Sequence, residues 1–450
     1  MLSVNLIQIT PGAGGMYCGN CFRDNTLVAE LRRQGHDTLL VPLYLPLTLD
    51  EAPTHAGSPT FFGGINVYLS QKSRLHQRAP RWFRRFFDSP KLLKWAAGKA
   101  AKTRAEDVGE LTVSMLRGEA GHQNRELSEL IDWLKTRPKP DAIFLSNALL
   151  VGFARRLKAE LGTRVICFLQ SEESFLDSLP ESERGEAWSV LSERAEDVDG
   201  WIAPTQYFAA RMSERLALPS AKVHVVPNGI SLQGYDQLPP RRPAADGPLT
   251  WGFFARQCPE KGLDLVIDAY LELRRRGKNP GLRLRVGGGC GPGDLPFVNA
   301  QKSKLADAGL SEEVSFHPNL SRKDKIAFLV GCDVLSVPAR ISEAFGLYLL
   351  EAWAAGTPVV QPDVCGFREL IEITGGGELY PKNNAASLAQ AMEALLLEPN
   401  RLRDLGASGR RAVTQHFSDS VMAREILAAT GRILAGLPPN SKARNRLRTP

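Results

Sequence analysis

The feature that most constrains the fold of this chain is a repeated alternation of short, apolar, β-rich runs with longer helical patterns. Such alternation is typical of α/β domains in which helices cover both faces of a parallel sheet. The strands predicted in the first half are 4–9, 38–42, 65–69, 142–146, 164–169, 200–204 and 223–227. Those predicted in the second half are 249–255, 282–286, 314–317, 334–337 and 358–361. The predicted fold class is therefore α/β, with two Rossmann-like parallel-sheet domains in tandem.

Residues 237–248 separate the two halves. They are rich in Pro, Arg and Asp and hold almost no apolar side chain, a composition typical of a linker between domains. We therefore expect an N-terminal domain at 1–236 and a C-terminal domain at 249–417. A helix at 418–437 is expected to close the fold, and residues 438–450 are expected to form a solvated basic tail.

The overall composition indicates a globular chain of 450 residues, with 43% hydrophobic and 23% charged residues. No apolar run reaches the roughly 18 to 20 residues that cross a bilayer. The first residues lack the basic and apolar regions of a signal peptide and are predicted to form a strand that enters a glycine loop. Seven scattered cysteines suggest no disulfide framework. We therefore expect a cytoplasmic protein, with peripheral association with the inner face of the membrane as the alternative.

The net charge of +7 is concentrated in one segment. Residues 71–104 hold eleven Lys and Arg against the single Asp88, a balance of +10, so the rest of the chain sums to −3. Aromatic residues such as Trp82 and Trp95 lie among the basic ones, a combination that suits an anionic membrane surface or a lipid-linked acceptor. RNA binding is a second interpretation, but no motif of a nucleic-acid-binding module accompanies the segment, so no nucleic acid partner is expected. The third interpretation is a helical hairpin packed on the sheet by its aromatic residues.

The segment 342–360, SEAFGLYLLEAWAAGTPVV, carries the strongest functional signal. A buried strand is predicted to lead into a loop with Glu343, after which Gly346 begins an apolar helix. The amides at the start of this helix, near Gly346 and Leu347, are unsatisfied donors that suit a diphosphate. Glu351, one turn further on, can accept hydrogen bonds from vicinal hydroxyls such as those of a ribose, and Glu343 can face a second set of hydroxyls. The alternative is an ordinary amphipathic helix with two surface glutamates.

Two basic residues follow another predicted strand. Arg256 comes directly after the strand 249–255, and Lys261 precedes the next helical pattern. A bidentate arginine and a lysine at a strand-to-helix turn suit a pyrophosphate, although an isolated pair with this spacing is also common on protein surfaces. The glycines 287–289, after the strand 282–286, allow a ligand to approach the backbone at the carboxyl end of the sheet.

Taken together, these motifs resemble those of the retaining glycosyltransferases of family 4, which have the GT-B fold. The resemblance extends over nearly the whole chain. It depends on Glu343 and Glu351 at the Glu-x7-Glu spacing, on Arg256 with Lys261, and on a Gly-x-x-Glu turn at Gly366. It implies two Rossmann-like domains that face each other across a cleft, transfer with retention of the anomeric configuration, and no need for a divalent metal or other cofactor.

The resemblance also implies roles for individual residues. Arg256 and Lys261 would hold the donor diphosphate, Glu351 the ribose and Glu343 the transferred sugar, which makes Arg256, Lys261 and Glu343 the candidate catalytic residues. The glycine loop after the first strand would face the donor. The residues expected to bind the donor are Gly14, Gly15, Arg256, Lys261, Gly288, Phe345, Gly346, Leu347 and Glu351.

The N-terminal half departs from the family pattern at one point. Relatives commonly carry a His after the strand that is 164–169 here, whereas this chain reads Gln170, Ser171, Glu172 and Glu173. Gln170, Glu172 and Glu173 are candidates for contacts with acceptor hydroxyls. The alternative for the two glutamates is that they are solvated acids at a helix N-terminus.

Cys18 and Cys21 have the spacing of a redox pair and lie where the glycine loop enters a helix. A zinc site would need further ligands, and no second cysteine pair exists. The other interpretation is that both are small residues lining a cleft.

The sequence thus predicts a hexosyltransferase that uses a nucleotide-diphosphate sugar as co-substrate and a glycan or lipid-linked acceptor. Two rivals use the same fold: a nucleotide-sugar epimerase, and a catalytically silent protein that binds a membrane surface or RNA.

Overall fold

The computed structural model describes residues 3–12, 19–44, 47, 49, 51–54, 105–239 and 247–440. By their internal contacts these residues form two units, the first running to Val226 and resuming at Ala423, and the second spanning Pro227–Met422. Each unit holds a parallel sheet, as expected for two Rossmann-like domains. The predicted strand 65–69, the basic segment 71–104, Gly14, Gly15 and Cys18 lie outside the described residues.

The first unit contains a six-stranded sheet with the order β2-β1-β3-β4-β5-β6. Its strands are β1 (Asn5–Thr10), β2 (Asp37–Pro42), β3 (Ala142–Leu145), β4 (Arg164–Phe168), β5 (Gly200–Ala203) and β6 (Val223–Val225). Its α-helices are α1 (Gly19–Arg33), α6 (Ala105–Arg117), α7 (Asn124–Lys135), α8 (Ala154–Leu161), α9 (Glu172–Asp177), α10 (Glu181–Ala195) and α11 (Gln206–Leu216). The chain leaves β1 toward β2 and returns on the other side at β3, so the order of strands reverses between β1 and β3.

The second unit contains a six-stranded sheet with the order β12-β11-β10-β7-β8-β9. Its strands are β7 (Thr250–Phe254), β8 (Arg283–Gly288), β9 (Val314–Pro318), β10 (Val334–Leu335), β11 (Val359–Pro362) and β12 (Gly377–Tyr380). Its helices are α12 (Leu263–Arg276), α13 (Leu295–Asp307), α14 (Arg322–Val330), α15 (Leu347–Ala354), α16 (Gly366–Thr374), α17 (Ala385–Leu396) and α18 (Pro399–His416). α19 (Asp419–Leu434) follows and continues into the first unit. The strand order reverses between β7 and β10, where doubly wound sheets place their ligands.

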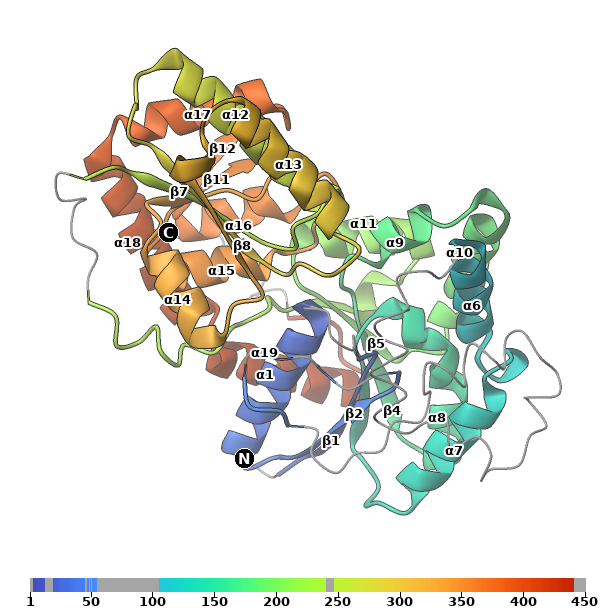
Figure 1. Ribbon diagram of the computed structural model, residues 1–450. Helices are drawn as coiled ribbons and strands as arrows, with labels where there is room; N and C mark the ends of the chain where they lie inside the picture. The colour runs from blue at the N-terminus through green and yellow to red at the C-terminus, as the bar shows by residue number, and fades with distance from the viewer. Residues whose placement is uncertain are drawn as a thin grey trace. The chain divides into compact units, whose positions relative to one another are not determined.

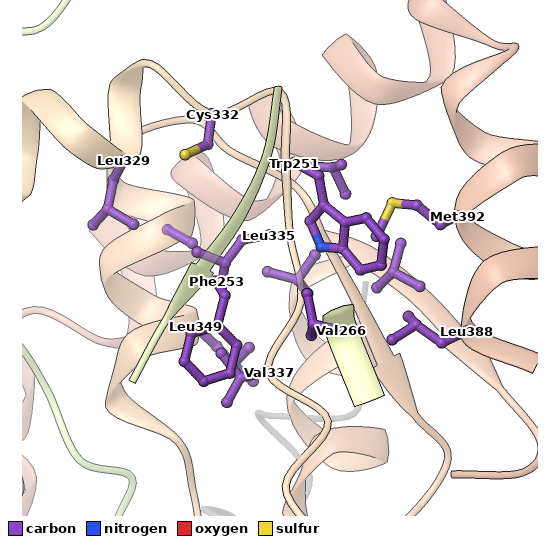
Figure 2. Close-up of a cluster of buried hydrophobic side chains, with 14 of the residues drawn as sticks. Trp251, Phe253, Val266, Leu329, Cys332, Leu335, Val337, Leu349, Leu388 and Met392 are labelled. Atoms are coloured by element: carbon purple, nitrogen blue, oxygen red, sulfur yellow. The ribbon is translucent and has the colours of Figure 1, made fainter. Parts of the chain in front are cut away.

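The core of the second unit forms around the central strands. Trp251 and Phe253 of β7 are fully buried, and Figure 2 shows them in a cluster with side chains from α12, α14, α15 and α17. In Figure 1, α12, α13 and α17 lie on one side of this sheet, and α14, α15 and α16 lie on the other. Because both faces are covered, the strands are continuously apolar, which explains why they were recognisable from sequence.

Two features of the second unit differ from the sequence-based expectation. β12 was not predicted, because its residues GELY offer only a weak strand pattern; the strand forms by pairing with β11. The segment 227–236, expected in the N-terminal domain, belongs to the second unit. Ile230 exchanges backbone hydrogen bonds with Phe417 and Asp419, and Tyr235 is 2% exposed in the second core.

Candidate functional site

Arg256 lies in the loop after β7 and is held by a carboxylate. Its Nε and Nη2 atoms donate to Oδ1 of Asp294 at 3.1 and 2.8 Å. Asp294 is 7% exposed and also accepts a hydrogen bond from the amide of Gly291, whereas the Arg256 side chain is 54% exposed. The hydrogen bonds to Asp294 raise the pKa of Arg256 above its ordinary value. Asp294 therefore fixes the edge of the Arg256 guanidinium group that carries Nε and Nη2, while the side chain remains exposed to solvent.

Lys261 and Glu343 form a second acid–base pair. Lys261 ends a short 3-10 turn, Pro259–Lys261, before α12, and Glu343 lies in the loop after β10. The Lys261 ammonium donates to Oε2 of Glu343, and the Tyr348 hydroxyl donates to the same oxygen at 3.3 Å. Burial, and next the negative charge of Glu343, raise the pKa of Tyr348 well above its usual range. Both donors therefore converge on one carboxylate oxygen.

Helix α15 begins directly after this loop. Gly346 has φ of +92° and ψ of +73°, a left-handed conformation that glycine adopts without strain, and no side chain caps the helix at this position. The first amides of α15 thus have no side-chain cap, and the role of Gly346 and Leu347 in binding a diphosphate stays a prediction. Phe345, predicted to contact the donor, has its side chain 3% exposed in the core, so only its backbone could do so.

The third pair lies one turn into α15. The Lys325 ammonium, from α14, donates to Oε1 of Glu351 at 2.6 Å. The Lys325 side chain is 8% exposed and that of Glu351 is 18% exposed. Lys325 was not identified from the sequence.

Gly288 at the end of β8 allows the backbones of two strands to approach closely. Its φ is +107°, and a Cβ atom at this position would lie 2.0 Å from the carbonyl oxygen of Ala255. Next to it, the amide of Gln257 donates to the carbonyl of Gly289 at 2.8 Å. These contacts join the loop that carries Arg256 to the glycine run after β8.

The second unit therefore gathers three acid–base pairs around the carboxyl ends of its strands. Arg256 follows β7 and Glu343 follows β10, the two strands between which the strand order reverses. The six charged groups are Arg256, Asp294, Lys261, Glu343, Lys325 and Glu351. Guanidinium and ammonium groups beside helix amides can hold a diphosphate, and carboxylates can accept from sugar hydroxyls.

In the first unit, the three acceptor-side candidates lie at the start of α9. Glu172 is 3% exposed, and its carboxylate accepts from the amides of Ala148 at 2.8 Å and Gln170 at 2.7 Å. Glu173 is 1% exposed and forms an ion pair with Arg211. The expectation that these are solvated acids is therefore wrong, because the fold encloses both side chains. Contact with an acceptor stays a prediction.

A buried ion pair close to Glu172 was also missed from the sequence. Arg23 and Asp24, on α1, have fully buried side chains, with Nη2 2.9 Å from Oδ1. The Arg23 guanidinium also donates to the carbonyl of Ser146 at 3.0 Å and lies 3.8 Å from the centre of the Phe168 ring. Burial raises the pKa of Glu172 to about 7, opposed mainly by its backbone hydrogen bonds and less by Arg23.

Among the residues that the structure describes, no three His, Cys, Asp or Glu side chains are grouped to hold a metal ion. No described helix has the length and hydropathy to span a membrane. Cys21 is fully buried, with its sulfur 3.9 Å from the Thr10 hydroxyl oxygen.

Two family models match the chain in succession. Residues 99–233 match the model described as Glycosyltransferase Family 4, and residues 236–412 match the one described as Glycosyl transferases group 1.

Among curated proteins, the chain is similar to a D-inositol 3-phosphate glycosyltransferase of Nocardia farcinica. The two are 32% identical over 215 residues, which cover 47% of this chain and 48% of that protein, so the chain spans about half the length of this relative. A GDP-mannose-dependent alpha-(1-6)-phosphatidylinositol monomannoside mannosyltransferase of Mycobacterium tuberculosis is 25% identical, with 63% of this chain and 73% of that protein covered.

Among solved structures, the chain resembles HepE of Anabaena in complex with UDP, with a TM-score of 0.65 and 15% identity over 95% of this chain and 99% of that one. It also resembles the sucrose-phosphate synthase of Thermosynechococcus elongatus, with a TM-score of 0.67 and 17% identity over 96% and 99%. At these identities the likeness shows the fold.

Proposed function

Since this chain belongs to the GT-B glycosyltransferases of family 4, we propose that it transfers a hexosyl group from a nucleotide-diphosphate sugar to an acceptor hydroxyl. We further propose that transfer retains the anomeric configuration and needs no divalent metal or other cofactor. The observation that carries this proposal is the grouping of the three acid–base pairs beside the reversal of strand order in the second unit.

The leaving group in such a reaction is a nucleoside diphosphate, on which negative charge increases as the glycosidic bond breaks. Arg256, Lys261 and the first amides of α15 would receive the diphosphate and stabilise this charge, because donors aimed at developing charge act more strongly in the transition state than in the ground state. In the structure, Asp294 and Glu343 hold the two cations. They are therefore already ordered when a diphosphate arrives, which reduces the entropy lost on binding.

Glu343 and Glu351 would bind hydroxyl groups on either side of the diphosphate. Glu343, whose Oε2 already accepts from Lys261 and Tyr348, would contact the transferred sugar. Glu351 would accept from the ribose. We assign no protein nucleophile: the acceptor hydroxyl would attack on the face from which the diphosphate leaves, which gives retention.

The acceptor is proposed to be a glycan or a lipid-linked molecule. Two relatives are named for inositol 3-phosphate and for a phosphatidylinositol mannoside. Inositol phosphates and phosphatidylinositol are therefore the first acceptors to test, with GDP-mannose and UDP-sugars as donors.

The test of this proposal is the variant Arg256→Ala, assayed once a donor and acceptor pair is found. Removing one donor to developing charge typically lowers turnover about 100-fold or more, so we expect a loss of this size with a nearly unchanged melting temperature. Arg275→Ala is the matched control, because the Arg275 side chain is 77% exposed and lies in the last turn of α12, at the opposite end of the helix from Lys261. Unchanged turnover in folded Arg256→Ala would refute the assignment.

The same assay tests stereochemistry and metal use. NMR of the product should show the anomer of the donor, and transfer should persist in EDTA. An inverted anomer, or activity restored only by Mg²⁺ or Mn²⁺, would contradict these two parts of the proposal.

A further inference from the structure

Lys325 is the least exposed cation of the three acid–base pairs. Its side chain is 8% exposed, against 21% for Lys261 and 54% for Arg256. It lies on α14, and its ammonium is 2.6 Å from Oε1 of Glu351. Lys325 lies outside both the Glu-x7-Glu motif and the loop after β7.

Packing alone does not explain a lysine at this position. Lys325 lies three and four residues before Phe328 and Leu329, which are 1% and 0% exposed, so it shares their buried helix face. An apolar side chain would extend that face. Burying a lysine and a carboxylate removes the hydration of two charges, and such a pair is often no more stabilising than apolar residues of the same volume. The pair is therefore better explained by what it does to Glu351.

The contact with Lys325 occupies only one of the two carboxylate oxygens of Glu351. Lys325 donates to Oε1, which restricts the Glu351 side chain to one orientation and leaves Oε2 to accept from another donor. Glu351 is one turn into α15, whose amides begin at Gly346. In a nucleoside diphosphate, only one methylene separates the ribose from the phosphates, so a diphosphate at the helix start would place the ribose near Glu351.

We propose that Lys325 is a positioning residue that holds Glu351 to receive the vicinal 2′ and 3′ hydroxyls, so that the site selects ribonucleotides over deoxyribonucleotides. This inference rests on the proposed function, because it requires a nucleoside diphosphate in the second unit. It assigns to Lys325 a part in nucleotide selection that acts through Glu351.

The experiment measures dissociation constants by calorimetry for UDP, GDP and ADP and for their 2′-deoxy and 3′-deoxy counterparts. In wild-type protein, the nucleotide that binds should lose about tenfold or more in affinity when either hydroxyl is absent, since hydrogen bonds to a charged group are strong. In Lys325→Met, the ribonucleotide should lose most of this advantage, while the affinity for the deoxynucleotides should stay within about twofold. A general loss of structure would instead weaken all nucleotides equally.

Lys323→Met is the matched control, with the same substitution on the same helix at an exposed position. It should keep the wild-type ratio of the affinity for the ribonucleotide to the affinity for the deoxynucleotide. Glu351→Gln should lower this ratio, as Lys325→Met does. The inference is overturned if the ratio is unchanged in Lys325→Met. It is equally overturned if wild-type protein shows no preference for the ribonucleotide, a result that does not depend on any variant folding. If no diphosphate binds at all, the proposed function fails as well.

Discussion

Glu172 is a carboxylic acid whose burial holds its pKa at about 7, from an ordinary value of 4.5. Its two oxygens accept from the amides of Ala148 and Gln170, so it joins the segment after β3 to the segment after β4. Desolvation is the larger effect, because it acts on the whole charge while the hydrogen bonds and Arg23 offset only part of it. Glu172 therefore links the stability of the first unit to pH.

The sign of this linkage follows from the direction of the shift. The folded state binds the proton more tightly than the unfolded chain, so stability falls as pH rises from about 4.5 to 7 and levels off above. A shift of this size corresponds to roughly 3 kcal/mol. We expect the free energy of unfolding of Glu172→Gln, relative to wild type, to rise by up to this amount between pH 5 and pH 8.

Urea denaturation of both proteins at four pH values measures this difference. Glu181→Gln, at an exposed glutamate that begins α10, is the control and should follow wild type at every pH. A difference between Glu172→Gln and wild type that stays constant with pH would show that Glu172 is ionised throughout.

Single residues also show where sequence reasoning reaches its limit. Arg256, Lys261, Glu343 and Glu351 could be selected because each follows a strand or begins a helix with a recognisable pattern. Asp294 and Lys325 could not be paired with them, because their partners are 38 and 26 residues away and only the tertiary fold brings them together. The one available signal for Lys325 was a lone lysine on an otherwise apolar helix face.

At the scale of elements, the packing of α18 on α15 depends on glycine. Gly409 lies against the ring of Trp353, a fully buried residue whose Nε1 donates to the carbonyl of Gly376 at 2.8 Å. A Cβ atom on Gly409 would fall 2.3 Å from Cδ1 of this ring. The hydrogen bond and the burial leave the indole no room to move, so the two helices can approach only with glycine at this position.

We therefore expect Gly409→Ala to destabilise the second unit by about 1 to 3 kcal/mol, the usual range for overpacking. Gly431→Ala is the comparison, because Gly431 lies in α19 with nothing within 4 Å of an added Cβ. There the gain in helix propensity should stabilise the protein by about 0.5 to 1 kcal/mol. Chemical denaturation measures the free energy of unfolding of both variants. If Gly409→Ala is stabilised as Gly431→Ala is, the Trp353 side chain adjusts easily to the added methyl group.

The strands illustrate what the sequence can predict at this scale. The ends of central strands such as β1, β4 and β7 were predicted to within one residue, because strands covered on both faces are continuously apolar. β12 was missed, since it is an edge strand of four residues with partly exposed side chains, and its pairing with β11 decides its structure.

For the whole molecule, the uneven distribution of charge is the property with the clearest functional consequence. The segment 71–104, which lies outside the described residues, has a net charge of +10, whereas the rest of the chain sums to −3. If it binds an anionic membrane, attraction of about 1 kcal/mol for each nearby Lys or Arg should make the whole protein sediment with anionic vesicles at low salt and release at high salt.

Replacing four basic residues by serine tests this expectation. The variant Arg81→Ser, Arg84→Ser, Arg85→Ser and Lys91→Ser should no longer sediment with vesicles that contain phosphatidylserine. Its affinity for the nucleotide should be unchanged, because the charged residues proposed to bind the donor, Arg256, Lys261 and Glu351, belong to the second unit. Wild-type protein that ignores such vesicles at low salt would favour a soluble acceptor.

Under the proposed function, the ion pair between Lys261 and Glu343 implies an order of events during donor binding. The cation assigned to the diphosphate pairs with the carboxylate assigned to the transferred sugar, so each group screens the charge of the other. A diphosphate that attracts Lys261 would release Glu343 to accept from a hydroxyl, whereas a free sugar would meet a carboxylate that is already engaged. Under the proposed function, a sugar hydroxyl would therefore reach this oxygen of Glu343 only after the leaving group has drawn Lys261 away.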